Sequence, residues 1–325
     1  MAISTLATGS ATLPDRSAAG PARPTRRRVD WRGAAMIWGF AAPALVVYVG
    51  FVLVPVALAA VYSLFNWNGL GPLERFIGLD NYVRALGDPV FLGAIGHNLL
   101  IVALSLLIQG PLAIGIALLL NRRLRGRTLI RTLIFVPYVL SEVVAGLAFK
   151  LLLQPGGPFD AFLAGIGLGG VTQLWLADGQ IVMGTLFFVL SWKYLGFAIL
   201  LMLAGLQSVP DELAEAAAID GASWWQIQRH ITLPLLGPTI RIWAFLSMIG
   251  SLQLFDMVWV LTGGGPVNAT TTMATYMVQY GFQRSQLGYG SAVAVILFVI
   301  SLVFALLYQR LVLRRDLAGA VTRSA

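Results

Sequence analysis

Six long apolar stretches constrain this chain more than any other feature of its sequence. A bilayer core of about 30 Å is crossed by about 20 apolar residues, because an α-helix rises 1.5 Å per residue. The stretches run over Met36–Tyr62, Ala94–Leu120, Leu129–Leu153, Ile181–Leu206, Leu235–Leu261 and Ala292–Val312. Each is long enough to cross a membrane, so we expect an all-α integral membrane protein with six transmembrane helices.

Composition supports this fold class and removes several kinds of chemistry. Hydrophobic residues make up 58% of the chain and charged residues only 11%, against about 25% charged residues in an ordinary soluble domain. The chain has no cysteine and only two histidines, His97 and His230, which are far apart. We therefore predict no disulfide, no metal site and no nucleic-acid partner, and a surface that contacts membrane lipid.

The basic residues lie mainly in alternate connections between the apolar stretches. Seventeen arginines lie in the N-terminal tail, the second-to-third connection, the fourth-to-fifth connection and the C-terminus, whereas the opposite connections hold three. Cytoplasmic loops retain positive charge, so both termini are expected in the cytoplasm. Residues 1–34 are predicted to be a disordered basic tail, 35–315 the six-helix membrane domain, and 316–325 a C-terminal cytoplasmic tail.

The connection over residues 207–234 predicts two short helices separated by a tight turn. Ser208 is a candidate cap for the first helix, and Asp220-Gly221 ends it, since glycine readily adopts the left-handed conformation of a turn. Ser223 and Gln226 have the spacing of a capping box for the second helix, which Pro234 is expected to limit. An amphipathic helix lying on lipid would carry several basic residues, whereas this segment offers alanine and acid.

This connection resembles the conserved cytoplasmic loop, known as the EAA loop, of permease subunits from bacterial binding-protein-dependent ABC importers. The resemblance rests on Glu215-Ala216-Ala217, on Gly221 four positions later, and on Ile231-x-Leu233-Pro234. It implies a helix-turn-helix coupling loop that docks into an ATP-binding subunit. The implied docking residues are Glu215, Ala216, Ala217, Asp220, Gly221, Ala222, Ile231, Leu233 and Pro234.

Three further stretches resemble the maltose, lactose and glycerol-3-phosphate branch of carbohydrate importers. They are Leu261–Pro266 with Thr270–Thr272, Gly288-Tyr289-Gly290, and Gly78–Tyr82. The resemblance implies a permease in the bacterial cytoplasmic membrane that carries a sugar or sugar derivative by alternating access. It also implies three kinds of protein partner: a second homologous permease, two cytoplasmic ATP-binding subunits and an extracytoplasmic solute-binding protein.

ATP hydrolysis is assigned to a partner because this chain lacks a phosphate-binding loop. That loop requires Gly-x-x-x-x-Gly-Lys followed by Ser or Thr, and neither Lys150 nor Lys193 has such neighbours. The chain is thus predicted not to be an enzyme and to hold no cofactor, with ATP and Mg bound by the partner ATPase.

Three ionisable side chains fall within the predicted spans, where charge is costly and often functional. They are Glu142, Lys193 and Asp256. Glu142 and Lys193 lie near the middle of their stretches, so a buried pair between them is a hypothesis, with a structural role and a binding role both open. Asp256 lies nearer the outer end, where it is more easily hydrated.

Aromatic faces combined with hydrogen-bonding groups are suited to sugars, and the fourth and fifth stretches supply both. By resemblance to the maltose-type permeases, the substrate pathway includes Trp192, Leu195, Gly196, Ile199, Ser251 and Leu254. Gln253 lies at a similar level to Ser251 and is added from the residue pattern alone.

Two other classes of membrane protein fit this sequence less well. An ion-coupled secondary transporter would also be apolar and cavity-forming, but it has no use for an alanine-rich docking loop. A membrane enzyme would need a catalytic cluster at one depth, and Glu142 and Asp256 lie at different depths.

Overall fold

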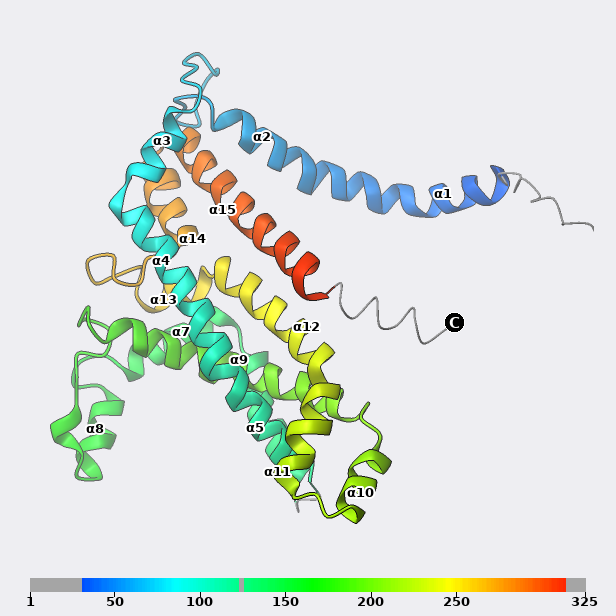
Figure 1. Ribbon diagram of the computed structural model, residues 1–325. Helices are drawn as coiled ribbons and strands as arrows, with labels where there is room; N and C mark the ends of the chain where they lie inside the picture. Colours follow the sequence, from blue (N-terminus) through cyan, green and yellow to red (C-terminus); the bar gives the residue numbers. More distant parts are fainter. Residues whose placement is uncertain (1–30, 123–125, 314–325) are drawn as a thin grey trace, which may run out of the picture. The chain divides into compact units, whose positions relative to one another are not determined.

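The structure is a computed structural model that describes residues 31–122 and 126–313. Within these ranges the chain is helical, and the only strand-like pairing is one isolated bridge between Phe65 and Phe76 (Figure 1). The predicted tails cover residues 1–34 and 316–325, of which 1–30 and 316–325 lie outside the described residues, as do Arg123 and Arg125. Residues 31–34 were predicted to be disordered, but they form the start of a helix that begins at Trp31.

The described residues form fifteen α-helices, several of them joined end to end through π-helical turns. Their bounds are α1 Trp31–Tyr48, α2 Val54–Tyr62, α3 Asp80–Gly87, α4 Pro89–Leu104, α5 Gly110–Leu120, α6 Arg127–Val139, α7 Glu142–Leu152, α8 Pro158–Gly165, α9 Val182–Leu206, α10 Asp211–Ile219, α11 Trp224–Ile227, α12 Leu233–Leu252, α13 Asp256–Leu261, α14 Met273–Tyr276 and α15 Leu287–Tyr308.

Five continuous helices in the described chain are long and apolar enough to cross a membrane, and a bent pair makes up to six. The continuous spans are Met36–Tyr62, Pro89–Leu120, Val182–Leu206, Trp224–Leu252 and Leu287–Val312. The predicted all-α membrane fold is therefore confirmed.

The third predicted span is not one continuous helix, which corrects the sequence-based expectation. Thr128–Val139 and Glu142–Leu152 meet at an angle of 95°. Leu140 and Ser141 between them are extended, with ψ of 143° and 141°. Both arms are apolar, so a hydropathy profile runs through the break without registering it.

The fifth predicted span also differs from the expectation, because α12 ends at Leu252 and α13 starts at Asp256. The buried side chain of Asn98 holds this second break. Its Nδ2 donates to the carbonyls of Ser251 (2.7 Å) and Leu252 (3.3 Å), and its Oδ1 accepts from the backbone N–H of Met273 (2.9 Å). One amide thus satisfies the last carbonyls of α12 and the first N–H of α14.

Replacing Asn98 by leucine is expected to destabilise the protein strongly. The variant leaves three buried backbone groups without this partner, and each unsatisfied buried group costs about 1–3 kcal/mol. A thermal unfolding scan of the protein in detergent should show a clear drop in the melting temperature. Asn121→Leu, at an exposed position, is the control, and equal melting temperatures for the two variants would contradict the role given to Asn98.

The structure divides into two units between Val54 and Pro55. In the second unit, three apolar clusters hold the helices together. One gathers α3, α4, α12, α14 and α15, a second gathers α4, α7, α9 and α13, and a third gathers α5, α9 and α12 with Ile134 of α6 against it. Helix α9 contributes to two of these clusters and so packs against both arms of the bent span.

Candidate functional site

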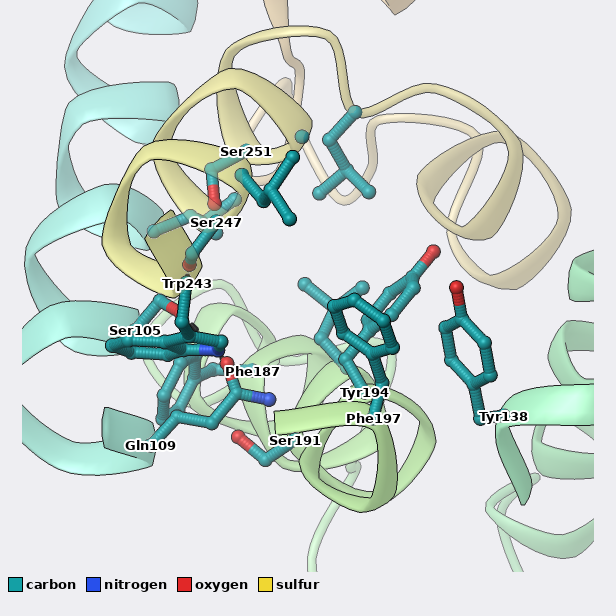
Figure 2. A pocket seen from close by; sticks show the side chains of 15 residues that line it. Ser105, Gln109, Tyr138, Phe187, Ser191, Tyr194, Phe197, Trp243, Ser247 and Ser251 are labelled. Atoms are coloured by element: carbon teal, nitrogen blue, oxygen red, sulfur yellow. Dashed lines mark hydrogen bonds between the residues drawn. The ribbon is translucent and has the colours of Figure 1, made fainter. Parts of the chain in front are cut away.

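A cavity of about 300 Å³ lies among α4, the π-helical turn Ser105–Gln109 that follows it, α6, α9 and α12 in the second unit. Its walls carry polar groups on one side and aromatic rings on another (Figure 2). The lining residues are Ile101, Ser105, Gln109, Tyr138, Phe187, Leu190, Ser191, Tyr194, Phe197, Trp243, Leu246, Ser247, Gly250, Ser251 and Leu254.

The polar wall is a chain of three hydrogen-bonded side chains. Ser105 Oγ donates to Gln109 Oε1 at 2.6 Å, and the Ser105 and Ser247 hydroxyls are 2.6 Å apart. A hydroxyl has one proton, so Ser247 must donate to Ser105 when Ser105 donates to Gln109. The amide nitrogen of Gln109 then remains a donor, and Figure 2 shows it turned toward the interior of the cavity.

Ser191 adds a hydroxyl that the described protein leaves unused. Its Oγ is buried and has no hydrogen-bond partner among the described residues, although Ser191 lines the cavity. Buried polar atoms are normally paired, so this oxygen is an exception beside the cavity.

The aromatic wall comes from α6 and α9. The rings of Tyr138 and Phe197 are stacked at 4.9 Å between centroids with planes 19° apart, and Tyr138 meets Tyr194 edge to face at 6.3 Å. Figure 2 shows this group across the cavity from Ser105 and Gln109. A pocket with apolar ring faces on one side and donors and acceptors on the other suits a polyhydroxylated molecule with alternating C–H and O–H surfaces.

No hydrogen bond or ion pair joins Glu142 and Lys193 among the described residues, and each group has another hydrogen-bond partner. Lys193, only 2% exposed, donates to backbone carbonyls of α6 and of Leu140 just after it. Glu142 instead accepts a hydrogen bond from the hydroxyl of Tyr194. Asp256 is exposed in the first turn of α13, where the positive end of the helix dipole favours a carboxylate.

Of the seven side chains predicted for a substrate pathway, Ser251 and Leu254 line the cavity. The other five lie elsewhere. Trp192 packs edge to face on Phe149 at 4.9 Å, and Gln253 is exposed at the end of α12.

Leu195, Gly196 and Ile199 lie at helix packing contacts. Leu195 and Ile199 belong to the apolar cluster of α5, α9 and α12. A Cβ added to Gly196 would come within 2.1 Å of the Ile134 carbonyl oxygen, so this glycine permits the close approach of α6 and α9.

The polar wall was not predicted, although the sequence contains a signal for it. Ser105 and Gln109 are four residues apart in one apolar span, and Ser247 and Ser251 are four apart in another. Residues four apart share one face of a helix. Such a polar pair within a membrane span marks the side of the helix that turns away from lipid.

The loop between α9 and α12 forms the predicted helix-turn-helix. Ser223 Oγ accepts from the Gln226 N–H at 3.4 Å while Gln226 Oε1 accepts from the Ser223 N–H at 2.7 Å, which confirms the capping box. Gly221 has a φ of +84°, which confirms the predicted turn.

Two local expectations for this loop are wrong. Ser208 does not cap α10, because its hydroxyl donates to the Gly205 carbonyl and Pro210 holds the N-cap position. Pro234 does not limit α11, since a π-helical turn over Gln228–Thr232 joins α11 to α12. Pro234 instead lies in the first turn of α12, two residues after that π-helical turn.

The predicted docking residues form a largely exposed surface on this loop. Glu215, Ala216, Asp220, Gly221 and Pro234 are exposed, and Ala217, Ala222, Ile231 and Leu233 are half-buried. A hollow of about 370 Å³ lies between the turn that follows α10 and the segment that runs from α11 into the π-helical turn. It is lined by Asp220, Gly221, Ala222, Gln226, Ile227, His230 and Ile231. Glu215 is not among the lining residues, so it lies on α10 outside this hollow.

A cation–π contact ties the loop to the end of α5. The Arg122 guanidinium lies 4.6 Å from the ring centre of Trp224, the first residue of α11. Such contacts contribute about 0.5–1 kcal/mol when exposed. The contact connects the base of the second span directly to the loop.

These features together define a membrane transport protein, since membrane-spanning helices surround a cavity with polar and aromatic walls and carry an exposed helix-turn-helix. The chain belongs to the family of binding-protein-dependent transport system inner membrane components, whose family model matches residues 109–316.

Similar proteins agree with this membership. The multiple sugar-binding transport system permease protein MsmF of Streptococcus mutans is 37% identical over 263 residues, 81% of this chain and 90% of that protein. The diacetylchitobiose uptake system permease protein NgcF of Streptomyces coelicolor is 32% identical over 306 residues, 90% of this chain and 86% of that protein.

A solved structure is similar as well. The crystal structure of a bacterial ABC transporter involved in the import of the acidic polysaccharide alginate contains a chain that aligns with a TM-score of 0.77 and 25% identity. The alignment covers 88% of this chain and 97% of that one. The comparisons confirm the resemblance to ABC importer permeases and give no support to the ion-coupled alternative.

Proposed function

We propose that this chain forms half of the translocation pathway for a sugar or sugar derivative, and that the cavity lined by Gln109, Ser247 and Tyr138 is its contribution to that pathway. The observation that carries the proposal is the pairing of a hydrogen-bonding wall with an aromatic wall inside the helical bundle. The names of the relatives, which refer to multiple sugars, diacetylchitobiose and alginate, support a carbohydrate cargo.

The proposed assembly contains a second homologous permease, two cytoplasmic ATP-binding subunits and an extracytoplasmic solute-binding protein. The family description, which makes transport dependent on a binding protein, supports the last of these. The exposed loop with Glu215 and Gly221 is the proposed docking site for an ATP-binding subunit, which binds ATP and Mg. The arginine distribution supports a cytoplasmic position for this loop and for both termini.

In this arrangement, closure of the ATP-bound subunits moves the docked loop, and the helices joined to it open the cavity to alternate sides. Helices α9 and α12 flank the loop and also line the cavity. A displacement of the loop is therefore transmitted along helices that themselves form the walls of the pathway.

The test is ATP-driven uptake by the transporter purified with its companion subunits and placed in liposomes. Labelled maltose, diacetylchitobiose and an alginate oligosaccharide are offered separately with the solute-binding protein. Uptake of at least one sugar should require ATP, and the Gln109→Leu variant should raise its KM about tenfold, since one lost hydrogen bond to a ligand is worth about 1 kcal/mol or more.

Ser301→Ala is the matched control for the Gln109 variant. Ser301 is a buried polar side chain of a span with no hydrogen-bond partner in the part of the chain that the structure describes. It does not line the cavity, so the KM of the Ser301→Ala variant should equal that of the parent. Uptake driven by an ion gradient without ATP would contradict the proposed function. An unchanged KM for Gln109→Leu would remove the cavity from the pathway.

A further inference from the structure

The break between α6 and α7 leaves backbone carbonyls at the end of α6 without helical partners. The side chain of Lys193 on α9 forms hydrogen bonds with them. Lys193 Nζ donates to the carbonyls of Pro137 at 3.4 Å, of Tyr138 at 3.3 Å, and of Leu140 at a shorter distance. Three N–H donors of one ammonium thus meet three carbonyl oxygens, and its charge lies at the negative end of the α6 dipole.

The next residue on α9 holds the other side of the same break. The Tyr194 hydroxyl donates a hydrogen bond to the carboxylate of Glu142, the first residue of α7. The Glu142 carboxylate lies at the positive end of the α7 dipole. Lys193 and Tyr194, adjacent in sequence, therefore contact both helix ends that the 95° bend exposes.

The two arms on either side of the break pack against different neighbours. Helix α6 packs closely on α9, with the Ile134 carbonyl beside Gly196. Helix α7 packs on α13, where Gly146 faces Val260 and Met257. Helix α9 also contacts both arms, through Trp192 against Phe149 of α7 and through Gly196 against Ile134 of α6. Lys193 and Tyr194 lie between these two contacts along α9, at the level of the break.

The break also fixes where the aromatic wall of the cavity lies. Tyr138 supplies one of the three carbonyls and lies in the last turn of α6, with its ring stacked on Phe197 and facing the cavity (Figure 2). If α6 continued straight into α7, this turn would be internally hydrogen-bonded. Lys193 would then have no free carbonyl oxygens to accept its hydrogen bonds.

We propose that Lys193 is a positioning residue that maintains the break in the third span and so keeps Tyr138 and Tyr194 in the cavity wall. The proposal rests on the proposed function only in taking this cavity as the sugar pathway. Lys193 does not line the cavity, so it acts through the backbone of α6 and not by touching a sugar.

Pulsed electron–electron double resonance, which measures the distance between two spin labels on the bent span, tests this proposal. The chain has no natural cysteine, so Leu129→Cys on α6 and Leu151→Cys on α7, both at exposed positions, provide its only labelling sites. A straight helix would separate these two Cα atoms by about 33 Å, and two arms bent by 95° by about 22 Å. The measurement is made on the assembled transporter in lipid nanodiscs.

The short distance is expected in the otherwise unchanged chain and in Lys193→Arg, which keeps the charge and the donors. Lys193→Met should shift the distribution toward the longer distance, and Lys193→Gln, which keeps two donors without charge, should lie between them. If the Lys193→Met chain does not assemble into the transporter, the distance distribution of Lys193→Gln is the one that tests the proposal. A distribution identical to the parent in Lys193→Met or Lys193→Gln would overturn the proposal.

The spin-label readout needs no substrate, so it separates this inference from the proposed function. A failed distance shift with normal ATP-driven sugar uptake removes Lys193 as a positioning residue and leaves the sugar pathway in place. If the distance shifts in the Lys193 variants but the parent transporter takes up no sugar, Lys193 remains a positioning residue and the proposed function is removed.

Discussion

Gly196→Ala is expected to prevent most of the chain from reaching its folded state in the membrane. The added Cβ would come within 2.1 Å of the Ile134 carbonyl oxygen and 3.2 Å of the Phe135 Cα. These are backbone atoms of α6, so relief requires α6 and α9 to separate. Overpacking in a protein core typically costs about 1–3 kcal/mol. Here the clash is with backbone atoms, which a change of side-chain rotamer does not relieve, so the cost should exceed that range.

The measurement is the fraction of chain that elutes as a monodisperse species after gentle detergent extraction. Gly184→Ala is the matched control, because it makes the same change in the same helix at a position with no heavy atom within 4 Å. Alanine favours a helix over glycine by about 1 kcal/mol, so the control should extract at least as well as the parent. Equal yields of the two variants would show that α6 and α9 do not approach as closely as the structure indicates.

The positions of the spans could be predicted from the sequence, whereas the break in the third span could not. The place of Gly196 in a long apolar stretch is evident, and the predicted first span agrees with the structure at both ends, Met36 and Tyr62. The break after Val139 was not evident, because hydropathy measures transfer into lipid and both arms transfer equally well. The break depends on Lys193, 53 residues from Leu140 in the chain, and such a partner is invisible to a local pattern.

The loop between α9 and α12 was predicted in more detail because its signals are local. Ser223 and Gln226 form their capping box within a single turn, and Gly221 needs only its own backbone to turn. A cavity depends on the rotation of each helix about its axis, which distant contacts determine. Trp192, predicted for the pathway, therefore proved to pack on Phe149, while the polar face of Ser105 and Gln109 was overlooked.

Glu215→Lys is expected to reduce ATP-driven uptake at least tenfold while leaving the chain folded and inserted. Glu215 is exposed on α10 and belongs to none of the apolar clusters of the described chain, so its replacement should leave packing intact. If the loop docks into an ATP-binding subunit, reversing this charge places a lysine where a carboxylate is expected. A tenfold loss corresponds to about 1.4 kcal/mol of coupling, less than a charge reversal at a buried contact commonly costs.

Gly221→Pro should have the same outcome by another route. Gly221 has a φ of +84°, whereas proline fixes φ near about −65°, so the variant must redirect α10 relative to α11. A docked loop transmits motion only if its two helices keep their mutual orientation. Uptake should therefore fall even though the membrane spans are unchanged.

Glu212→Lys separates docking from a general effect of charge on this loop. It reverses an equally exposed carboxylate of the same helix, and its position in the first turn makes it the more costly change for the helix itself. Uptake and ATP hydrolysis are measured together on transporter in liposomes. Loss of uptake in Glu215→Lys and Gly221→Pro, with Glu212→Lys near the parent, assigns the loop to docking. Normal uptake in both Glu215→Lys and Gly221→Pro would remove the basis for that assignment, because the charge and the turn would then both be dispensable.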